Sequence, residues 1–146
     1  MDELAWDEIV ERFGAAQNWW VATSGPGGPH AVPVWGVAVG QALHFYGEPS
    51  SVRSRNLAAD PRAVLHLESG SDVLALHGSA PAGGPAYADG AVVAAYRAKY
   101  THPTDRQYLP DADGMAGVLL HTVVPARAFA WRFDGQGDGT VRRWRA

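Results

Sequence analysis

Two arginines stand at the start of a predicted helix, where their charge could hold an anion. Arg53 and Arg55 follow Ser50 and Ser51, either of which can cap a helix over residues 52–59. Free N–H groups at a helix N-terminus favour an anion, and guanidinium groups bind phosphate oxygens in pairs. Cations at this end of a helix oppose the helix dipole unless an anion is present. The pattern therefore favours a site for a phosphorylated ligand over a pair of solvated side chains.

Two predicted strands lead the chain to this helix. Residues 30–35 alternate in the period-2 pattern of a strand, and Gly40-Gln41 then turns the chain into a second strand over 42–46. We expect these strands to pair and to deliver the chain to the two serines.

Several short segments, taken in chain order, match one family. They are WVAT at 20–23, PHAVPVW at 29–35, LHFY at 43–46, RSRNLAADPRAVLHLE at 53–68, Trp131 and Arg143-Trp144. On these segments the chain resembles the flavin- and deazaflavin-binding split-barrel family, the pyridoxamine-phosphate-oxidase-like proteins, and most closely its branch that uses coenzyme F-420. The most specific part is NLAADPR behind a basic pair at this distance from PVW.

The resemblance implies a mostly β fold, an antiparallel split β-barrel of six to seven strands with peripheral helices. It also implies a homodimer with one cofactor site per subunit at the interface. The activity implied is that of an oxidoreductase that uses F-420 to transfer hydride to a small conjugated organic acceptor. The alternatives are an FMN-dependent oxidase or reductase of the same fold, a non-catalytic cofactor-binding protein, and a haem- or tetrapyrrole-binding protein.

The resemblance also assigns expected roles to residues of this chain. Val32 to Trp35 would contact the ring, Arg53 and Arg55 would hold the phosphate, and Asn56 would support the turn. The cofactor-binding residues expected in full are Val32, Pro33, Val34, Trp35, Tyr46, Ser50, Ser51, Arg53, Arg55, Asn56, Arg143 and Trp144. No side chain is identified as a general acid, so the catalytic residues stay unassigned.

Composition narrows the function classes. The 146 residues predict a single domain over 1–146, and 17 Gly with 10 Pro favour short strands and many turns. The net charge of −3 argues against a nucleic-acid partner. Because the chain has no cysteine, redox chemistry would need a borrowed cofactor. An acidic, amphipathic N-terminus and the lack of a long apolar run predict a cytoplasmic protein with no membrane partner.

The remaining segments predict further elements. Helices are expected over 2–13 and 87–100, the second as scaffold, and the polar stretch 101–117 is a candidate substrate-side loop. Further strands are expected over 18–23, 63–68, 72–80, 118–124, 128–133 and 140–144.

The six histidines lack HxH or HxxxH spacing, which favours hydrogen-bonded wall residues over metal ligands. No metal site is therefore expected.

Overall fold

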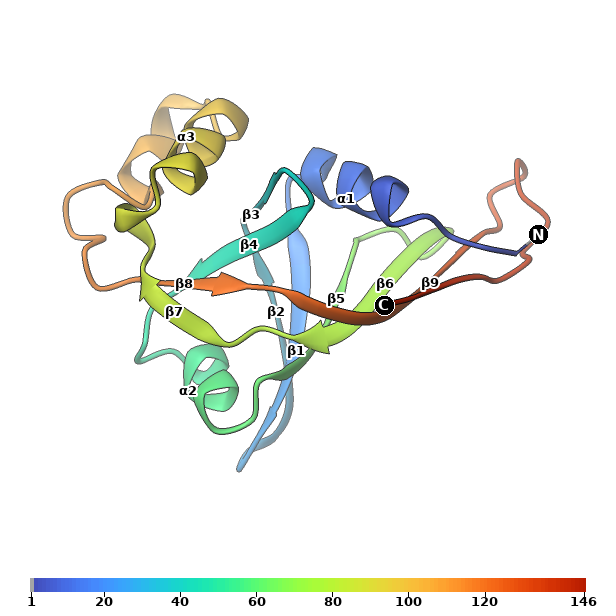
Figure 1. The fold of residues 1–146 in the computed structure, drawn as a ribbon, viewed down its shortest axis with the longest axis horizontal. Coiled ribbons are helices and arrows are strands. Elements are labelled where there is room, and N and C mark those ends of the chain that lie inside the picture. The colour runs from blue at the N-terminus through green and yellow to red at the C-terminus, as the bar shows by residue number, and fades with distance from the viewer. Residues whose placement is uncertain (1) are drawn as a thin grey trace.

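The computed structural model describes residues 2–146, which form two antiparallel sheets and a few helices (Figure 1). The large sheet has the strand order β10-β9-β6-β5-β1-β2, and the small sheet has the order β3-β4-β8-β7. The strands are β1 (Trp19–Gly25), β2 (Gly28–Val34), β3 (Gly36–Val39), β4 (Ala42–Gly47), β5 (Arg62–His66), β6 (Asp72–Ser79), β7 (Ala82–Pro85), β8 (Leu119–Thr122), β9 (Val124–Arg132) and β10 (Arg142–Arg145). The helices are α1 (Trp6–Ala15), α2 (Val52–Ala59) and α3 (Gly90–Lys99), with 3-10 turns η1 (Ala86–Ala88) and η2 (Pro103–Tyr108).

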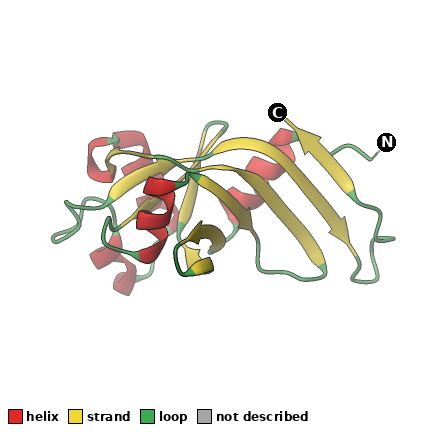
Figure 2. Cartoon of the chain, turned by 90° about the horizontal axis from the view of Figure 1, so that it is seen from below, coloured by secondary structure: helices red, strands yellow, loops and turns green. Residues whose placement is uncertain are grey.

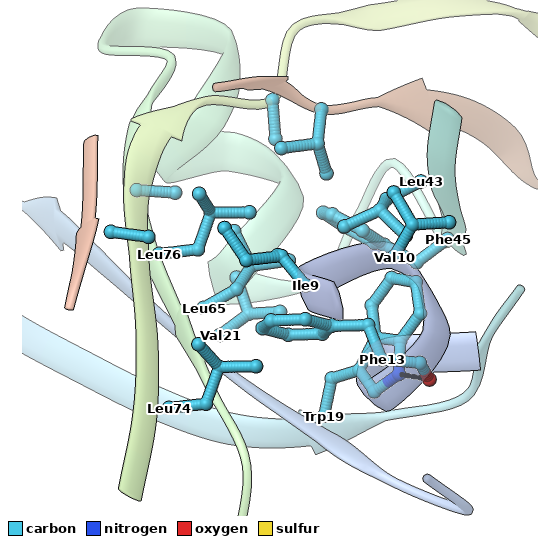
Figure 3. Packing of buried hydrophobic residues seen from close by; sticks show 14 of the residues in the cluster. Ile9, Val10, Phe13, Trp19, Val21, Leu43, Phe45, Leu65, Leu74 and Leu76 are labelled. Carbon is cyan, nitrogen blue, oxygen red and sulfur yellow. Dashed lines mark hydrogen bonds between the residues drawn. The ribbon is translucent and has the colours of Figure 1, made fainter. Parts of the chain in front are cut away.

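One hydrophobic core lies between the two sheets and α1 (Figure 3). Helix α1 contributes Ile9, Val10 and Phe13, which lie on one helical face because they are three or four residues apart. The Trp19 indole is fully buried beside them, and its Nε1 donates a hydrogen bond of 2.7 Å to the Phe13 carbonyl. A polar atom is thereby satisfied inside an apolar core.

The chain passes from the large sheet to the small sheet at Trp35. Strand β2 ends at Val34 and pairs with β1, whereas β3 begins at Gly36 and pairs with β4. Strand β2 therefore ends one residue before the predicted end at Trp35, although it begins two residues earlier than predicted, and it does not pair with the strand over 42–46. At this change of sheet the backbone passes close to a buried ring, since a Cβ on Gly36 would lie 2.4 Å from the Trp19 ring. Only glycine can follow Trp35 at this depth.

The number of strands also differs from the prediction. The described residues form ten strands instead of six to seven, although the fold class is as predicted. The chain changes sheet again between β8 and β9, where the sequence pattern indicated one strand over 118–124. The short strand β7 pairs with β8 and was not predicted.

Side chains at the C-terminal end of α3 form hydrogen bonds with the backbone of Trp35-Gly36, where the chain crosses from the large sheet to the small sheet. The Tyr96 hydroxyl donates to the Trp35 carbonyl at 2.9 Å, and the Tyr100 hydroxyl accepts from the Gly36 N–H at 2.9 Å. The Lys99 ammonium donates to the Gly36 carbonyl. Two side chains of α3 and that of its C-cap residue Tyr100 thus satisfy the backbone where the sheet ladders are interrupted.

Local sequence signals predicted several elements correctly. Helix α2 covers the predicted residues 52–59, and the Ser51 hydroxyl caps it by accepting from the Ser54 N–H at 3.1 Å. Strands are also present where they were predicted over 18–23, 63–68 and 72–80, with β1 paired to β2 and β5 paired to β6. The first helix is shorter than the predicted 2–13 at its start, because residues 2–4 pair with Arg143 of β10 instead.

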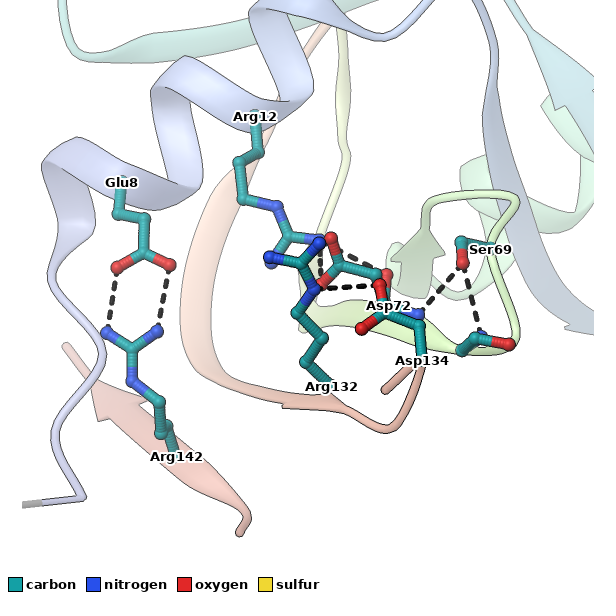
Figure 4. Close-up of polar contacts among 8 residues, drawn as sticks. Glu8, Arg12, Ser69, Asp72, Arg132, Asp134 and Arg142 are labelled. Atoms are coloured by element: carbon teal, nitrogen blue, oxygen red, sulfur yellow. Dashed lines mark hydrogen bonds and ion pairs between the residues drawn. The ribbon is translucent and has the colours of Figure 1, made fainter. Parts of the chain in front are cut away.

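Ion pairs tie α1 to the strands beneath it (Figure 4). Glu8 accepts two hydrogen bonds from Arg142 of β10, and Arg12 pairs with Asp72 of β6 at 3.1 Å. The Arg142 guanidinium lowers the pKa of Glu8. Each of these partly exposed pairs contributes roughly 0 to 1 kcal/mol, so they fix the position of the helix more than they stabilise the fold.

None of the helices described over residues 2–146 is long and apolar enough to cross a membrane.

Replacing Gly36 tests whether the close approach of the backbone to the Trp19 ring requires a glycine. Gly36→Ala would force a methyl group into the buried Trp19 ring, so we expect the free energy of unfolding to fall by about 1 to 3 kcal/mol in a urea titration. Gly70→Ala is the matched control, because a Cβ at Gly70 meets no atom within 4 Å. Equal stability of the two variants would contradict the steric role of Gly36.

Candidate functional site

A groove of about 370 Å³ opens beside the crossing. It is bounded by the end of β2, by β4, by α2 and by η2. Its lining residues are Asn18, Pro33, Val34, Trp35, Tyr46, Arg53 and Tyr108. Ligand pockets in proteins are about 300 to 1,000 Å³, so the groove has the size of a small-molecule site.

Aromatic side chains form the walls of this groove. Trp35 stacks on Tyr100 with ring centroids 4.3 Å apart and planes 8° apart, and Tyr108 meets Trp35 edge-on at 6.1 Å. The Tyr46 hydroxyl donates to the Tyr108 carbonyl at 2.7 Å, which joins β4 to η2. Burial raises the pKa of Tyr46 to about 12, so its hydroxyl stays a neutral donor at pH 7. The walls are therefore uncharged and fixed by stacking and hydrogen bonding.

Arg53 brings a positive charge to the groove without a counter-ion. Its Nη2 donates to the Tyr46 carbonyl at 3.2 Å, while its Nε is buried and has no hydrogen-bond partner. No carboxylate within residues 2–146 forms an ion pair with it. Burial lowers the pKa of the guanidinium, yet an arginine stays charged at neutral pH. Because a partly buried unpaired cation is costly, Arg53 is suited chemically to bind an anion.

The structure separates the two arginines of the sequence motif. Arg53 faces the groove, whereas Arg55 is exposed and lies outside it. Residues two positions apart on a helix point to different sides, which accounts for the divergence. Asn56 is buried on a third side, where its amide donates to the Thr23 hydroxyl at 3.1 Å. That bond joins α2 to β1.

Of the other predicted site residues, Pro33, Val34, Trp35 and Tyr46 line the groove and the rest do not. Val32 lies opposite buried Val21 of β1, so its side chain points to the core face of the sheet.

The two serines and the C-terminal pair also lie outside the groove. Ser51 serves as the helix cap and Ser50 is exposed. Arg143 and Trp144 lie on β10, where Trp144 packs on Trp6 with ring centroids 4.7 Å apart. In this single chain they do not reach the groove.

Two groove residues were missed by sequence reasoning. Tyr108 comes from η2, inside the stretch 101–117 that the sequence indicated as a substrate-side loop, and it is one of few aromatic residues in that polar segment. Asn18 immediately precedes β1 and carries no signal of its own.

Two of the histidines, His44 and His121, are buried in strands and hydrogen-bonded. Nδ1 of His44 contacts the Thr122 hydroxyl at 3.0 Å, and Nδ1 of His121 contacts the Ala80 carbonyl at 2.7 Å. Over the described residues, no three His, Asp or Glu side chains gather closely enough to hold a metal ion.

No family model matches the sequence, and no curated protein sequence matches it. Solved structures do match. A conserved hypothetical protein from Mycobacterium tuberculosis is 22% identical, with a TM-score of 0.73 over 88% of this chain and 85% of that chain.

Two further matches carry functional names. An F420 reductase is 22% identical, with a TM-score of 0.64 over 81% of this chain and 94% of that chain. A Listeria innocua protein named as a candidate pyridoxamine 5'-phosphate oxidase is 12% identical, with a TM-score of 0.64 over 86% of this chain and 96% of that chain. The chain therefore has the split β-barrel fold of these proteins, with two sheets that do not close into a continuous barrel.

The lysine behind the groove gives a pH-dependent test. Burial lowers the pKa of Lys99 to about 8, and its ammonium lies 5.5 Å from the Trp19 ring centroid and 5.3 Å from that of Tyr100. Between about pH 8 and pH 10, the unfolded chain binds more protons at this position than the folded chain. The Lys99 contribution to stability therefore rises with pH over this range.

We expect the free energy of unfolding of the wild type, minus that of Lys99→Met, to increase from pH 8 to pH 10. Urea titrations at each pH measure this difference, and taking the difference cancels the titration of the tyrosines. A difference that is constant or falls with pH would show that Lys99 is not perturbed in this way.

Proposed function

We propose that the protein is an oxidoreductase that binds a phosphorylated, flavin-type ring cofactor in the groove. The observation that carries the proposal is the unpaired, partly buried Arg53 guanidinium at the edge of an aromatic groove. A phosphate would supply the missing counter-ion and accept charge-assisted hydrogen bonds. The rings of Trp35 and Tyr108 support a planar guest through stacking and edge contacts.

Within this class we propose coenzyme F-420 as the cofactor, with hydride transfer to a small conjugated organic acceptor. When bound, F-420 would supply the hydride chemistry. The chain itself would bind the phosphate through Arg53, orient the ring against Trp35, and keep water from its buried side. The sequence resemblance to the F-420 branch supports this choice, as does the structural similarity to an F420 reductase.

FMN is the alternative cofactor on the same groove, supported by the similarity to the candidate pyridoxamine 5'-phosphate oxidase. A non-catalytic protein that only binds the cofactor would use the same contacts. A tetrapyrrole is less well supported, because no histidine lines the described groove to serve as an axial ligand.

The two arginines of α2 give a matched pair of variants for the cofactor site. The wild-type protein is titrated with F-420 and with FMN, following tryptophan quenching. Arg53→Met removes charge-assisted hydrogen bonds of roughly 1.5 to 3 kcal/mol each, so we expect the affinity for the preferred cofactor to fall about 10- to 100-fold. Arg55→Met should change the affinity less than about threefold, because Arg55 is exposed outside the groove.

Binding of neither cofactor to the wild type would refute the proposed function. Equal losses in the two variants would refute the assignment of the phosphate to Arg53 alone. Tight binding without reduction of any conjugated acceptor would favour the non-catalytic alternative.

We further propose that the protein is a homodimer formed through the outer face of the large sheet. Opposite residues of paired strands share a face, and the register places Trp20, Val64, Val73, Phe129 and Trp131 among the residues on this outer face. In Figure 2, α1 lies behind these strands. A face so rich in aromatic and branched side chains is typical of an interaction surface.

A charge on this face tests the dimer. Light scattering after gel filtration should give about twice the 15.6 kDa of one chain for the wild type. Trp131→Glu would place a charge in the interface, and we expect it to shift the protein to the monomer. Tyr87→Glu is the control, because Tyr87 is an exposed aromatic residue in η1, away from the sheet. A wild-type monomer, or a dimer that tolerates Trp131→Glu, would contradict the proposed interface.

A further inference from the structure

Three polar side chains meet around the backbone of Gly47, and one of them, Arg53, also lines the groove. A Cβ at Gly47 would lie 2.5 Å from the Ser54 hydroxyl, 3.3 Å from Nη2 of Arg53 and 3.3 Å from Nε2 of His121. We call this arrangement of Arg53, Ser54 and His121 the Gly47 niche. The absence of a side chain at residue 47 is what lets the three groups converge.

The niche contains polar atoms that the fold leaves unsatisfied. Ser54 is 8% exposed, and its hydroxyl is buried without a hydrogen-bond partner. Nε of Arg53 is likewise buried and unpartnered. Buried polar groups are normally hydrogen-bonded, so two unpaired atoms in one place indicate a site that is completed by something else.

His121 is held in one orientation within the niche. Its ring is 1% exposed and stacks on Phe45, with centroids 4.9 Å apart and planes 5° apart. A carbonyl only accepts, so Nδ1 must carry the hydrogen that is donated to the Ala80 carbonyl. Nε2 is therefore the atom of His121 that can gain a proton.

Arg53 supplies the charge that acts on this histidine. The strand neighbours directly opposite His121 are Phe45 of β4 and Ala82 of β7, neither of which titrates. From α2 it faces Arg53 and Ser54, of which Arg53 is charged. Burial and then the Arg53 charge lower the pKa of His121, although the Ala80 hydrogen bond acts in the opposite direction. Without an anion, His121 is thus neutral at pH 7.

We propose that His121 takes up a proton from solvent when an anion binds to Arg53, so that the Gly47 niche couples anion binding to pH. The proposal rests on the anion-binding role of Arg53 in the proposed function. A bound anion cancels the repulsion between the Arg53 charge and a protonated His121. The buried Ser54 hydroxyl, which lies on the same side of Gly47 as Nε2 and has no hydrogen-bond partner, places a polar oxygen near the added charge. His121 is accordingly a positioning residue that acts through Arg53.

The sign of the pH dependence follows from this coupling. The pKa of His121 is lower in the free protein than in the anion-bound protein, so binding takes up a proton at any pH between these two values. Anion affinity therefore rises as the pH falls through this interval and is constant above it. A shift of about one pKa unit corresponds to roughly a tenfold difference in affinity between a pH well below the interval and a pH well above it.

The test uses inorganic sulfate, which stays doubly ionised throughout the pH range in which histidine titrates. NMR titrations of the histidine ring signals from pH 5 to pH 8.5 are recorded in sodium sulfate and in sodium chloride of equal ionic strength. The His121 signals are identified by their loss in His121→Asn. We expect sulfate to raise the pKa of His121 by about 0.5 to 1 unit. The exposed His102 is the internal control and should not respond.

Each outcome decides the proposal. A sulfate-dependent rise at His121 that is lost in Arg53→Met supports it. An unchanged pKa of His121 in the wild type overturns it, whether or not sulfate binds, and this comparison needs no variant that changes Arg53. A rise that persists in Arg53→Met also overturns it, because the effect would then not pass through Arg53. Since sulfate replaces the cofactor, these results are separate from the F-420 and FMN titrations that test the proposed function.

Discussion

The passage of the chain from one sheet to the other at Trp35-Gly36 is the constraint on which the site depends. The backbone must leave the large sheet, pass within contact of the buried Trp19 ring, and enter the small sheet at once. A glycine makes the close approach possible, and Tyr96 and Lys99 of α3, with the C-cap residue Tyr100, replace the ladder hydrogen bonds lost there. The same crossing turns Trp35 outward, where Tyr100 supports its ring from behind. Core packing and the groove wall are therefore two results of one backbone geometry.

The polar side of the groove, unlike its aromatic wall, contains a charged group whose hydrogen bonds are not all satisfied. The aromatic wall is fully supported by stacking and hydrogen bonds, whereas Arg53 is left with a buried, unpartnered Nε and no counter-ion. A fold that optimised stability alone would have paired or removed this charge. Where local chemistry conflicts with stability in an otherwise consistent fold, a functional site is the natural explanation.

The sequence predicted those parts of the structure that local signals determine. Helix α2 was predicted at its observed bounds, because a serine cap and an Asp-Pro stop act over a few residues. The change of sheet at Trp35 was not predicted, because a period-2 pattern identifies a strand without saying which sheet it joins. The start of α1 was placed too early for a similar reason, since residues 2–4 are held by β10 from the far end of the chain.

The site was predicted in part, and the reasons are again physical. Pro33, Val34, Trp35, Tyr46 and Arg53 do come together in the groove. Helical phase could have separated Arg53 from Arg55, because residues two positions apart cannot share a face. Tyr108 and His121 could not be placed from sequence, since a loop conformation brings the first to the groove and only strand pairing brings the second behind Arg53.

The most direct test of the central claim is a crystal structure of the protein with its preferred cofactor, either F-420 or FMN. Our account predicts that a phosphate oxygen lies within hydrogen-bond distance of the Arg53 guanidinium, with the ring in the groove between Trp35, Tyr46 and Tyr108. An ordered cofactor with its phosphate on Arg55, or with its ring outside this groove, would contradict the account.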